Sequence, residues 1–257
     1  MVKNVMVFDT ETTSLNKPFC YNVGYIIAAV NTETCTAKIL CEKEYVIEQV
    51  WHNPMCFATA YYADKRPLYV KAMRARKISM DKWGKVTQDM IRDIKRHEVS
   101  GAYAYNSSFD EKVFSFNCDW FKTINPFDNV PIFDIRGYAH KGLMTKEFFD
   151  FCDRHERFTE SGNYSTTAET MFQYLTQNES FEEEHTALAD SQIELKILLT
   201  ALYKGKLELG IDYQAKRSIP RRVEKTLTIK DNKNNVLATF PNYGYTVYKK
   251  NDTIKLK

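Results

Sequence analysis

Short apolar runs separated by polar turns predict strands in the first part of the chain. Residues 5–8 form a run of β-forming residues, and residues 22–30 and 37–46 form two longer ones. A polar turn at residues 31–34 joins the second run to the third. Three successive strands with short connections predict a sheet that begins with antiparallel neighbours.

After these strands the pattern alternates between strand and helix. Residues 102–105 and 130–135 are predicted strands, and Ser107 or Ser108 is expected to cap a helix after the first of them. A long helix is predicted over residues 187–203.

A clear helical stripe precedes this long helix. Its apolar residues recur at i, i+3, i+4 and i+7, and Ser165 before them is the expected cap. The stripe consists of Ala168, Met171, Phe172 and Leu175. Strands first, and then strands alternating with helices, predict the fold class α/β, with a mixed central sheet flanked by helices.

Two segments stand outside this alternation. Residues 47–87 hold aromatic and basic residues with weak periodicity, which predicts a helical or irregular insertion. Residues 206–220 form a polar linker, and residues 226–257 predict two hairpins. We therefore expect a main domain of residues 1–204, followed by an appendage of residues 205–257 that contains the linker and a small basic β tail.

Composition limits the class of protein. The 257 residues are 44% hydrophobic and 27% charged, which excludes a disordered or fibrous protein. The longest apolar run, residues 23–30, is too short to cross a bilayer, and Asp9 comes before a signal-peptide core could form. We therefore expect a cytoplasmic protein with no membrane partner. Six cysteines without a C-x-x-C pair or zinc spacing indicate reduced structural thiols.

Charge is distributed unevenly, although the net charge is only +3. Residues 201–257 hold 13 basic and 5 acidic residues, and residues 65–85 hold eight basic residues against Asp81 alone. The rest of the chain is acidic. This pattern suits a carboxylate-rich site that takes a polyanion, and solvated surface charge is the alternative.

Three motifs supply candidate chemistry, and each is weak by itself. In FDTETT, Asp9 and Glu11 lie two apart in a strand and so point to one face. In NSSFD, Asp110 falls on the first turn of a helix, where acidic residues are common anyway. In HTALAD, Asp190 belongs to the long helix, and His185 reaches the same place only from the loop before it. An exposed strand end and a surface or core histidine are the structural alternatives.

Taken together, four carboxylates and one histidine at strand ends and helix starts favour a metal site. Hard oxygen ligands without cysteine suit Mg²⁺ or Mn²⁺. Two such ions about 4 Å apart are a common means of hydrolysing a phosphodiester.

The order FDTETTSL, NSSFD and HTALAD resembles the three motifs of the DEDDh-type (DnaQ-like) 3′–5′ exonucleases, which have an RNase H-like fold. The spacing from His185 to Asp190 matches this branch, and Thr186 stands where the sister branch has tyrosine. The resemblance covers roughly residues 3–46 and 88–202. It implies an enzyme that hydrolyses single-stranded DNA or RNA from a free 3′ end to 5′-mononucleotides with two metal ions.

The resemblance also implies roles for individual residues. Asp9 bridges both ions, and Glu11 and Asp190 complete the site of the first. Asp110 holds the second ion through water, and His185 accepts the proton of the attacking water. The residues expected to hold the 3′-terminal nucleotide are Thr10, Thr12, Thr13, Leu15, Asn106 and Phe109. A helix cap and a core aromatic are the alternative roles of the last two.

Two other functions are compatible with the same fold. One is a proofreading subunit that acts with a separate DNA polymerase, and the other is a nuclease-fold binding module without activity. The basic segments 65–85 and 217–225 are expected to hold the strand behind its 3′ end, with Tyr69 and Trp83 stacked on bases. A solvated surface is the alternative for both segments.

Overall fold

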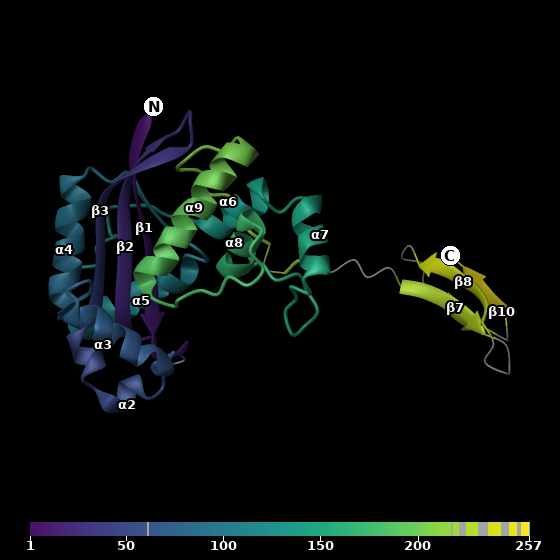
Figure 1. Cartoon of the computed structure of the whole chain (residues 1–257), viewed down its shortest axis with the longest axis horizontal. Helices are drawn as coiled ribbons and strands as arrows, with labels where there is room; N and C mark the ends of the chain where they lie inside the picture. The colour runs from purple at the N-terminus through teal and green to yellow at the C-terminus, as the bar shows by residue number, and fades with distance from the viewer. Residues whose placement is uncertain are drawn as a thin grey trace.

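A mixed sheet of six strands forms the centre of the protein (Figure 1). The computed structural model describes residues 1–60, 62–216 and 218–220, together with four strands near the C-terminus. The spatial order is β4–β3–β2–β1–β5–β6. The first three strands of the chain are antiparallel, whereas β4 runs parallel to β3, β5 to β1 and β6 to β5. The strands are β1 (Val2–Thr12), β2 (Cys20–Asn31), β3 (Thr36–Ile47), β4 (Ser79–Asp81), β5 (Gly101–Ala104) and β6 (Ile132–Asp134).

Helices cover both faces of this sheet. Helices α4 and α5 pack on one face, and α6, α8 and α9 pack on the other (Figure 1). The helical elements are α1 (Glu48–Trp51), α2 (Pro54–Phe57), the 3-10 turn η1 (Ala63–Lys65), α3 (Arg66–Arg74), α4 (Trp83–Arg96), α5 (Ser108–Phe121), α6 (Ile135–Gly142), α7 (Lys146–Arg154), α8 (Ala168–Thr176) and α9 (Ala187–Gly205). No helix among the residues described is long and apolar enough to span a membrane.

The alternation of side chains along β1 divides the core into two clusters. Met6 and Phe8 belong to the cluster on the α4 and α5 face, whereas Val5 and Val7 belong to the cluster on the α6 and α9 face. Strand β2 is buried along nearly its whole length, as its continuous apolar run requires. A polar side chain within β2 therefore needs partners inside the protein.

The predicted α/β class, with a mixed sheet flanked by helices, is confirmed. The predicted β tail is also present as two antiparallel pairs, and the turns within them lie outside the described residues, as do residues 217 and 221–224 of the second basic segment. The pairs are β7 (Lys225–Lys230) with β8 (Val236–Asn242), and β9 (Val247–Lys250) with β10 (Thr253–Leu256).

The segment predicted as an insertion contributes to the core. It forms α1, α2, η1 and α3, and β4 extends the sheet beside β3. Tyr69 and Trp83 are both 0% exposed, so the prediction that they stack on bases is wrong. Both side chains join the cluster on the α4 and α5 face instead, because burying a large aromatic surface is strongly favourable.

Two predicted helix caps are also wrong. Thr167, not Ser165, caps α8, since its hydroxyl oxygen accepts the Thr170 N–H at 3.2 Å. No side chain caps α5, and the Ser107 hydroxyl donates to Glu111 Oε1 at 3.1 Å. In both cases the hydroxyl has a side-chain partner that competes with the helix N–H groups.

Helix α9 lies very close to β2 at Gly24. A Cβ atom at this position would lie 2.1 Å from the main-chain nitrogen of Leu188 and 2.3 Å from the carbonyl carbon of Ala187. One turn later, the Ser191 hydroxyl donates to the Gly24 carbonyl oxygen at 3.3 Å. A side chain at position 24 would therefore push the start of α9 off the sheet.

We expect Gly24→Ala to lower the free energy of unfolding by about 3 kcal/mol, because the main chain of α9 has no room for the added methyl group. Gly84→Ala is the matched control. Its Cβ would meet nothing closer than Thr123 Cγ2 at 3.3 Å, and alanine is favoured over glycine in a helix. Urea denaturation of both variants measures the difference, and equal stabilities would contradict the close approach.

Candidate active site

The end of β1 carries the first two carboxylates. Asp9 pairs with Gly24 of β2 and Glu11 pairs with Asn22, so both lie in regular strand and project from the same face. Glu11 is buried and Asp9 is half-buried. The charge of Asp9 acts on Glu11, so the two carboxylates are neighbours, as the sequence predicts.

Asp110 reaches the same place from the neighbouring strand. Because β5 runs parallel to β1, the helix that follows it, α5, begins at the edge of the sheet where β1 ends. Asp110 lies in the first turn of α5 and is 2% exposed. Its Oδ1 accepts a hydrogen bond of 2.6 Å from the Thr10 hydroxyl. Thr10, which was expected to contact the substrate, thus connects β1 to α5.

Asn22 fixes the start of α9, which carries Asp190 in its first turn. The Asn22 Oδ1 accepts the N–H of Ala187 at 2.8 Å, and its Nδ2 donates to the carbonyl oxygen of Tyr45 at 3.0 Å. Ala187 is the first residue of α9, and Thr186 before it gives no side-chain cap. Asn22 therefore satisfies a helix N–H group that would otherwise be unpaired in the core.

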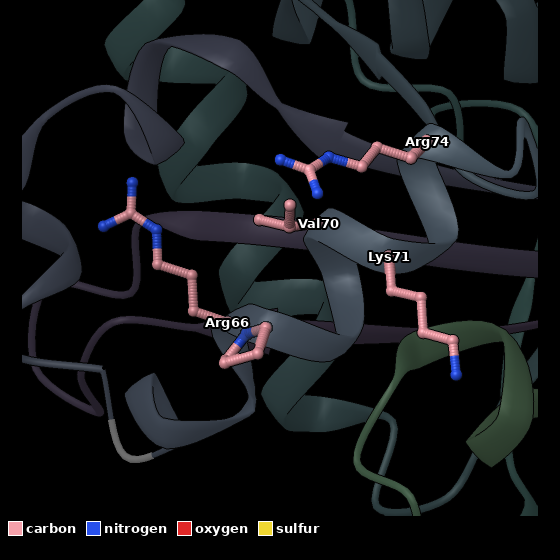
Figure 2. Close-up of a pocket in the computed structure, with 5 residues that line it drawn as sticks. Arg66, Val70, Lys71 and Arg74 are labelled. Carbon is pink, nitrogen blue, oxygen red and sulfur yellow. The ribbon is translucent and has the colours of Figure 1, made fainter.

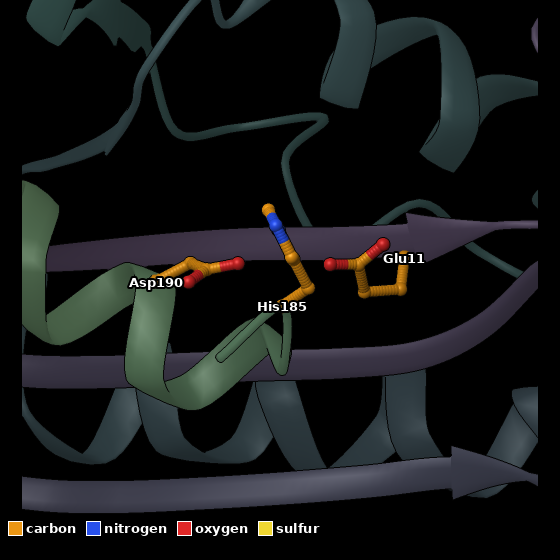
Figure 3. A group of neighbouring side chains, drawn as sticks. All are labelled: Glu11, His185 and Asp190. Carbon is orange, nitrogen blue, oxygen red and sulfur yellow. The ribbon is translucent and has the colours of Figure 1, made fainter. Parts of the chain in front are cut away.

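His185 lies on the loop before α9, as predicted, in a left-handed backbone conformation with φ of 54°. One potential ligand atom each from Glu11, His185 and Asp190 lie within 4.8 Å of one another (Figure 3). The imidazole stacks on the Tyr62 ring, with centroids 3.9 Å apart and planes 13° apart. The His185 carbonyl oxygen accepts a 3.0 Å hydrogen bond from the Tyr69 hydroxyl.

Burial of several carboxylates at one place raises their pKa values. Burial raises the pKa of Asp9 to about 7. Burial and then the charges of Asp9 and Glu183 raise the pKa of Asp190 to about 9. The pKa values of Glu11 and Asp110 also lie well above their usual range, through burial and then the Asp9 charge. Within the described part of the chain, no lysine or arginine forms an ion pair with any of the four motif carboxylates.

This donor set fits a divalent cation. Carboxylate oxygens are the ligands that Mg²⁺ and Mn²⁺ prefer, and a nearby positive charge favours the ionised form of a buried carboxylate. Among the described residues, Asp190 Oδ1 is buried without a hydrogen-bond partner. The side chains that would hold such ions are Asp9, Glu11, Asp110 and Asp190.

Sequence reasoning missed three further acidic residues near this site. Glu194 is 3% exposed and lies four residues after Asp190 on α9, a spacing that places both on one helix face and was a usable signal. Glu44 on β3 and Glu183 on the loop before α9 have pKa values raised to about 7, chiefly by burial. Asn22 was also missed, although a polar residue inside a strand buried on both faces marks a position of this kind.

The other residues expected to hold the 3′-terminal nucleotide differ in exposure. Leu15 is 73% exposed and Asn106 is exposed, so both are accessible to a ligand. Thr12 and Phe109 are half-buried, and Phe109 packs against the core. Thr13 is 2% exposed. Their contacts with a nucleotide stay predictions.

Comparison with known proteins gives only distant structural similarity. No known family and no curated protein sequence matches the chain. Among solved structures, it is similar to a 3′-exonuclease from a study of 3′-end specific recognition of the histone mRNA stem-loop. That match has a TM-score of 0.49 and 13% identity, and covers 79% of this chain and 83% of the other. It is also similar to E. coli Exonuclease I in complex with a dT13 oligonucleotide, with a TM-score of 0.48 and 12% identity. That match covers 79% of this chain but only 42% of the other.

The raised pKa values predict how stability depends on pH when metal is removed. A carboxylate with a raised pKa in the folded state stabilises the fold at low pH, and this stability is lost as the pH rises through the folded-state value. We therefore expect the melting temperature in EDTA to fall between pH 5.5 and pH 8.5, because over this range Asp9 and Asp190 are ionised in the unfolded chain but keep their protons in the folded protein, up to about 7 and about 9 respectively.

Asp9→Asn should reduce this dependence and raise the melting temperature at pH 8.5 by roughly 3–6 °C, and Mn²⁺ should raise that of the unmodified protein. Asp119→Asn, at an exposed carboxylate on α5, is the control. Differential scanning calorimetry measures the melting temperatures of the unmodified protein and of both variants. If the melting temperature of Asp9→Asn falls with pH as steeply as that of the control, the argument is contradicted.

Proposed function

We propose that this chain is a metal-dependent 3′–5′ exonuclease of the DEDDh type, which hydrolyses single-stranded DNA or RNA to 5′-mononucleotides. The observation that carries the proposal is the convergence of carboxylates and His185 from three separate motifs, with no basic side chain paired to the carboxylates among the described residues. Two bound divalent ions would activate water and stabilise the negative charge that develops on the phosphate.

We assign each motif residue a role that its position supports. Asp9 lies among the other three carboxylates, since its charge acts on Glu11, Asp110 and Asp190, and this suits it to bind both ions. Glu11 and Asp190 would hold the first ion with it, from β1 and α9. Asp110, which accepts a hydrogen bond from the Thr10 hydroxyl, would hold the second.

His185 is suited to be the general base. Burial, and then the charge of Lys65, lower the pKa of its imidazole, which keeps the ring neutral and able to accept a proton at neutral pH. Its Nδ1 lies 3.9 Å from Glu183 Oε2, so we assign proton transfer from the attacking water to Nε2. The Tyr62 stack and the Tyr69 hydrogen bond hold the ring and its main chain in place.

Digestion of end-labelled oligonucleotides tests the proposed function. We expect nucleoside 5′-monophosphates from linear single-stranded DNA or RNA in the presence of Mn²⁺ or Mg²⁺, because water attacks the terminal phosphate and the neighbouring 3′ oxygen leaves. A 3′-phosphate should block the reaction. Asp9→Ala should leave less than about 5% of the activity, since it removes the ligand shared by both ions, whereas Asp119→Ala should be fully active.

Three results would contradict this function. They are cleavage of a circular single strand, products that carry a 3′-phosphate, and strand binding by a correctly folded protein without cleavage under any metal condition. The last result would favour the nuclease-fold binding module.

We expect His185→Ala to lower kcat by roughly 10²-fold or more, the usual contribution of a general base. Because His185 is not a ligand in this proposal, the affinity for Mn²⁺ measured by calorimetry should be nearly unchanged. His52→Ala, at an exposed histidine after α1, is the control for activity. A collapse of metal affinity in His185→Ala would instead identify His185 as a ligand.

A further inference from the structure

Helix α3 carries three exposed basic side chains beside the candidate active site. Arg66, Lys71 and Arg74 line a shallow depression of about 480 Å³ together with Pro67 and Val70 (Figure 2). All three basic residues are exposed. None of them forms an ion pair within the part of the chain that the structure describes, in contrast to Lys43 and Lys85, which pair with buried aspartates.

The guanidinium group of Arg66 is held in place by aromatic rings. Its central carbon lies 5.0 Å from the ring centroid of Trp51 and 5.0 Å from that of Phe57. Such contacts hold the cationic group against the rings, and because Arg66 is exposed, its N–H donors remain available to bind an anion. An arginine fixed in this way loses less conformational entropy on binding than a free side chain does.

Helix α3 is also connected directly to the loop of the proposed general base. The Tyr69 hydroxyl donates to the His185 carbonyl oxygen at 3.0 Å, and Tyr69 itself is fully buried. Lys71 lines a second depression, of about 350 Å³, together with Glu184 and Thr186 on either side of His185. Lys71 therefore connects the basic depression on α3 to a second one that the loop of His185 borders.

The acidic site repels a nucleic-acid strand, and the basic surface of α3 can offset this repulsion. The motif carboxylates, together with Glu183 and Glu194, repel the phosphates of an incoming strand, and bound ions compensate only at the scissile phosphate. Positive charge along the approach raises the local concentration of a polyanion. Arg66 and Arg74 are eight residues apart on one helix, about 12 Å along its axis, which is enough for contacts with more than one phosphate.

We propose that Arg66, Lys71 and Arg74 bind the internucleotide phosphates of the strand on the 5′ side of the nucleotide being removed. This inference rests on the proposed function and specifies its substrate as a polymer rather than a dinucleotide. Contacts with phosphates carry no base information, so the selection is by length and charge and is independent of sequence. Tyr69 on α3 and Trp83 at the start of α4 are buried, so neither side chain stacks on bases.

Equilibrium binding tests the proposal without requiring catalysis. The probe is a fluorescein-labelled single strand of about 20 nucleotides, oligo-dT or oligo-U, titrated with the Asp9→Ala protein at several salt concentrations. The test variant adds Arg66→Gln, Lys71→Gln and Arg74→Gln. The matched control adds Lys38→Gln, Lys95→Gln and Arg96→Gln, which remove the same charge from exposed positions on β3 and α4.

We expect the test variant to bind at least about tenfold more weakly at low salt, and the slope of log K against log[salt] to become shallower by about 2, since each phosphate contact contributes roughly 0.7. The control should keep the slope of the parent protein. Equal slopes in test and control would overturn the proposal. So would displacement of the strand from the parent protein by polyglutamate as effectively as by unlabelled strand, because the surface would then bind acidic proteins.

Kinetics separate this inference from the proposed function. In the protein with Asp9 intact, the ratio of kcat/KM for the long strand to kcat/KM for a dinucleotide should fall about tenfold in the α3 variant, through KM. This ratio does not change when part of the enzyme is unfolded, because both values fall together. If the triple variant does not fold, the double variant Lys71→Gln, Arg74→Gln replaces it in this experiment. An unchanged ratio would overturn the inference while the exonuclease remains, whereas absence of cleavage in the parent protein would overturn the proposed function alone.

Discussion

The site depends on the contact between the start of α9 and strand β2. Gly24 allows the main chain of the helix to lie closer to the strand than any side chain would permit. Two residues earlier, Asn22 supplies the hydrogen-bond acceptor that the first turn of α9 lacks. Because Asp190 is on this turn and His185 is on the loop that leads into it, one contact sets the position of both residues relative to β1.

The apolar core opposes a strong electrostatic repulsion at this place. Phe8, which directly precedes Asp9, is 0% exposed. The centroid of its ring lies 4.4 Å from the ring centroid of Phe127 and 5.7 Å from that of Phe114. The chain thus changes from core to acidic site within one residue. Packed rings on one side keep the strand end rigid, so the carboxylates cannot relieve their repulsion by moving apart and instead take up protons or bind cations.

The parts of the fold and site that depend on local pattern could be predicted from the sequence. Strand positions followed from apolar runs, and Asp9, Glu11 and Asp110 followed from a strand end and a helix start. The apolar run marks Asn22 as an unusual polar position in a buried strand, but its partner on α9 could not be predicted, because that depends on which helix crosses β2. Tyr69 was assigned to the surface because the helices around it are too short to show a periodic apolar stripe.

The hydroxyl of Tyr69 lies 3.0 Å from both Asn22 Oδ1 and the His185 carbonyl oxygen, so it joins the anchor of α9 to the loop before it. Tyr69 belongs to residues 51–86, a segment that contains none of the three motifs. A shortened relative without this segment would need another hydrogen-bond donor for the loop before α9 and other side chains to bury the core. The segment therefore belongs to the structural core of the site, and a truncated version of this protein would have to retain it.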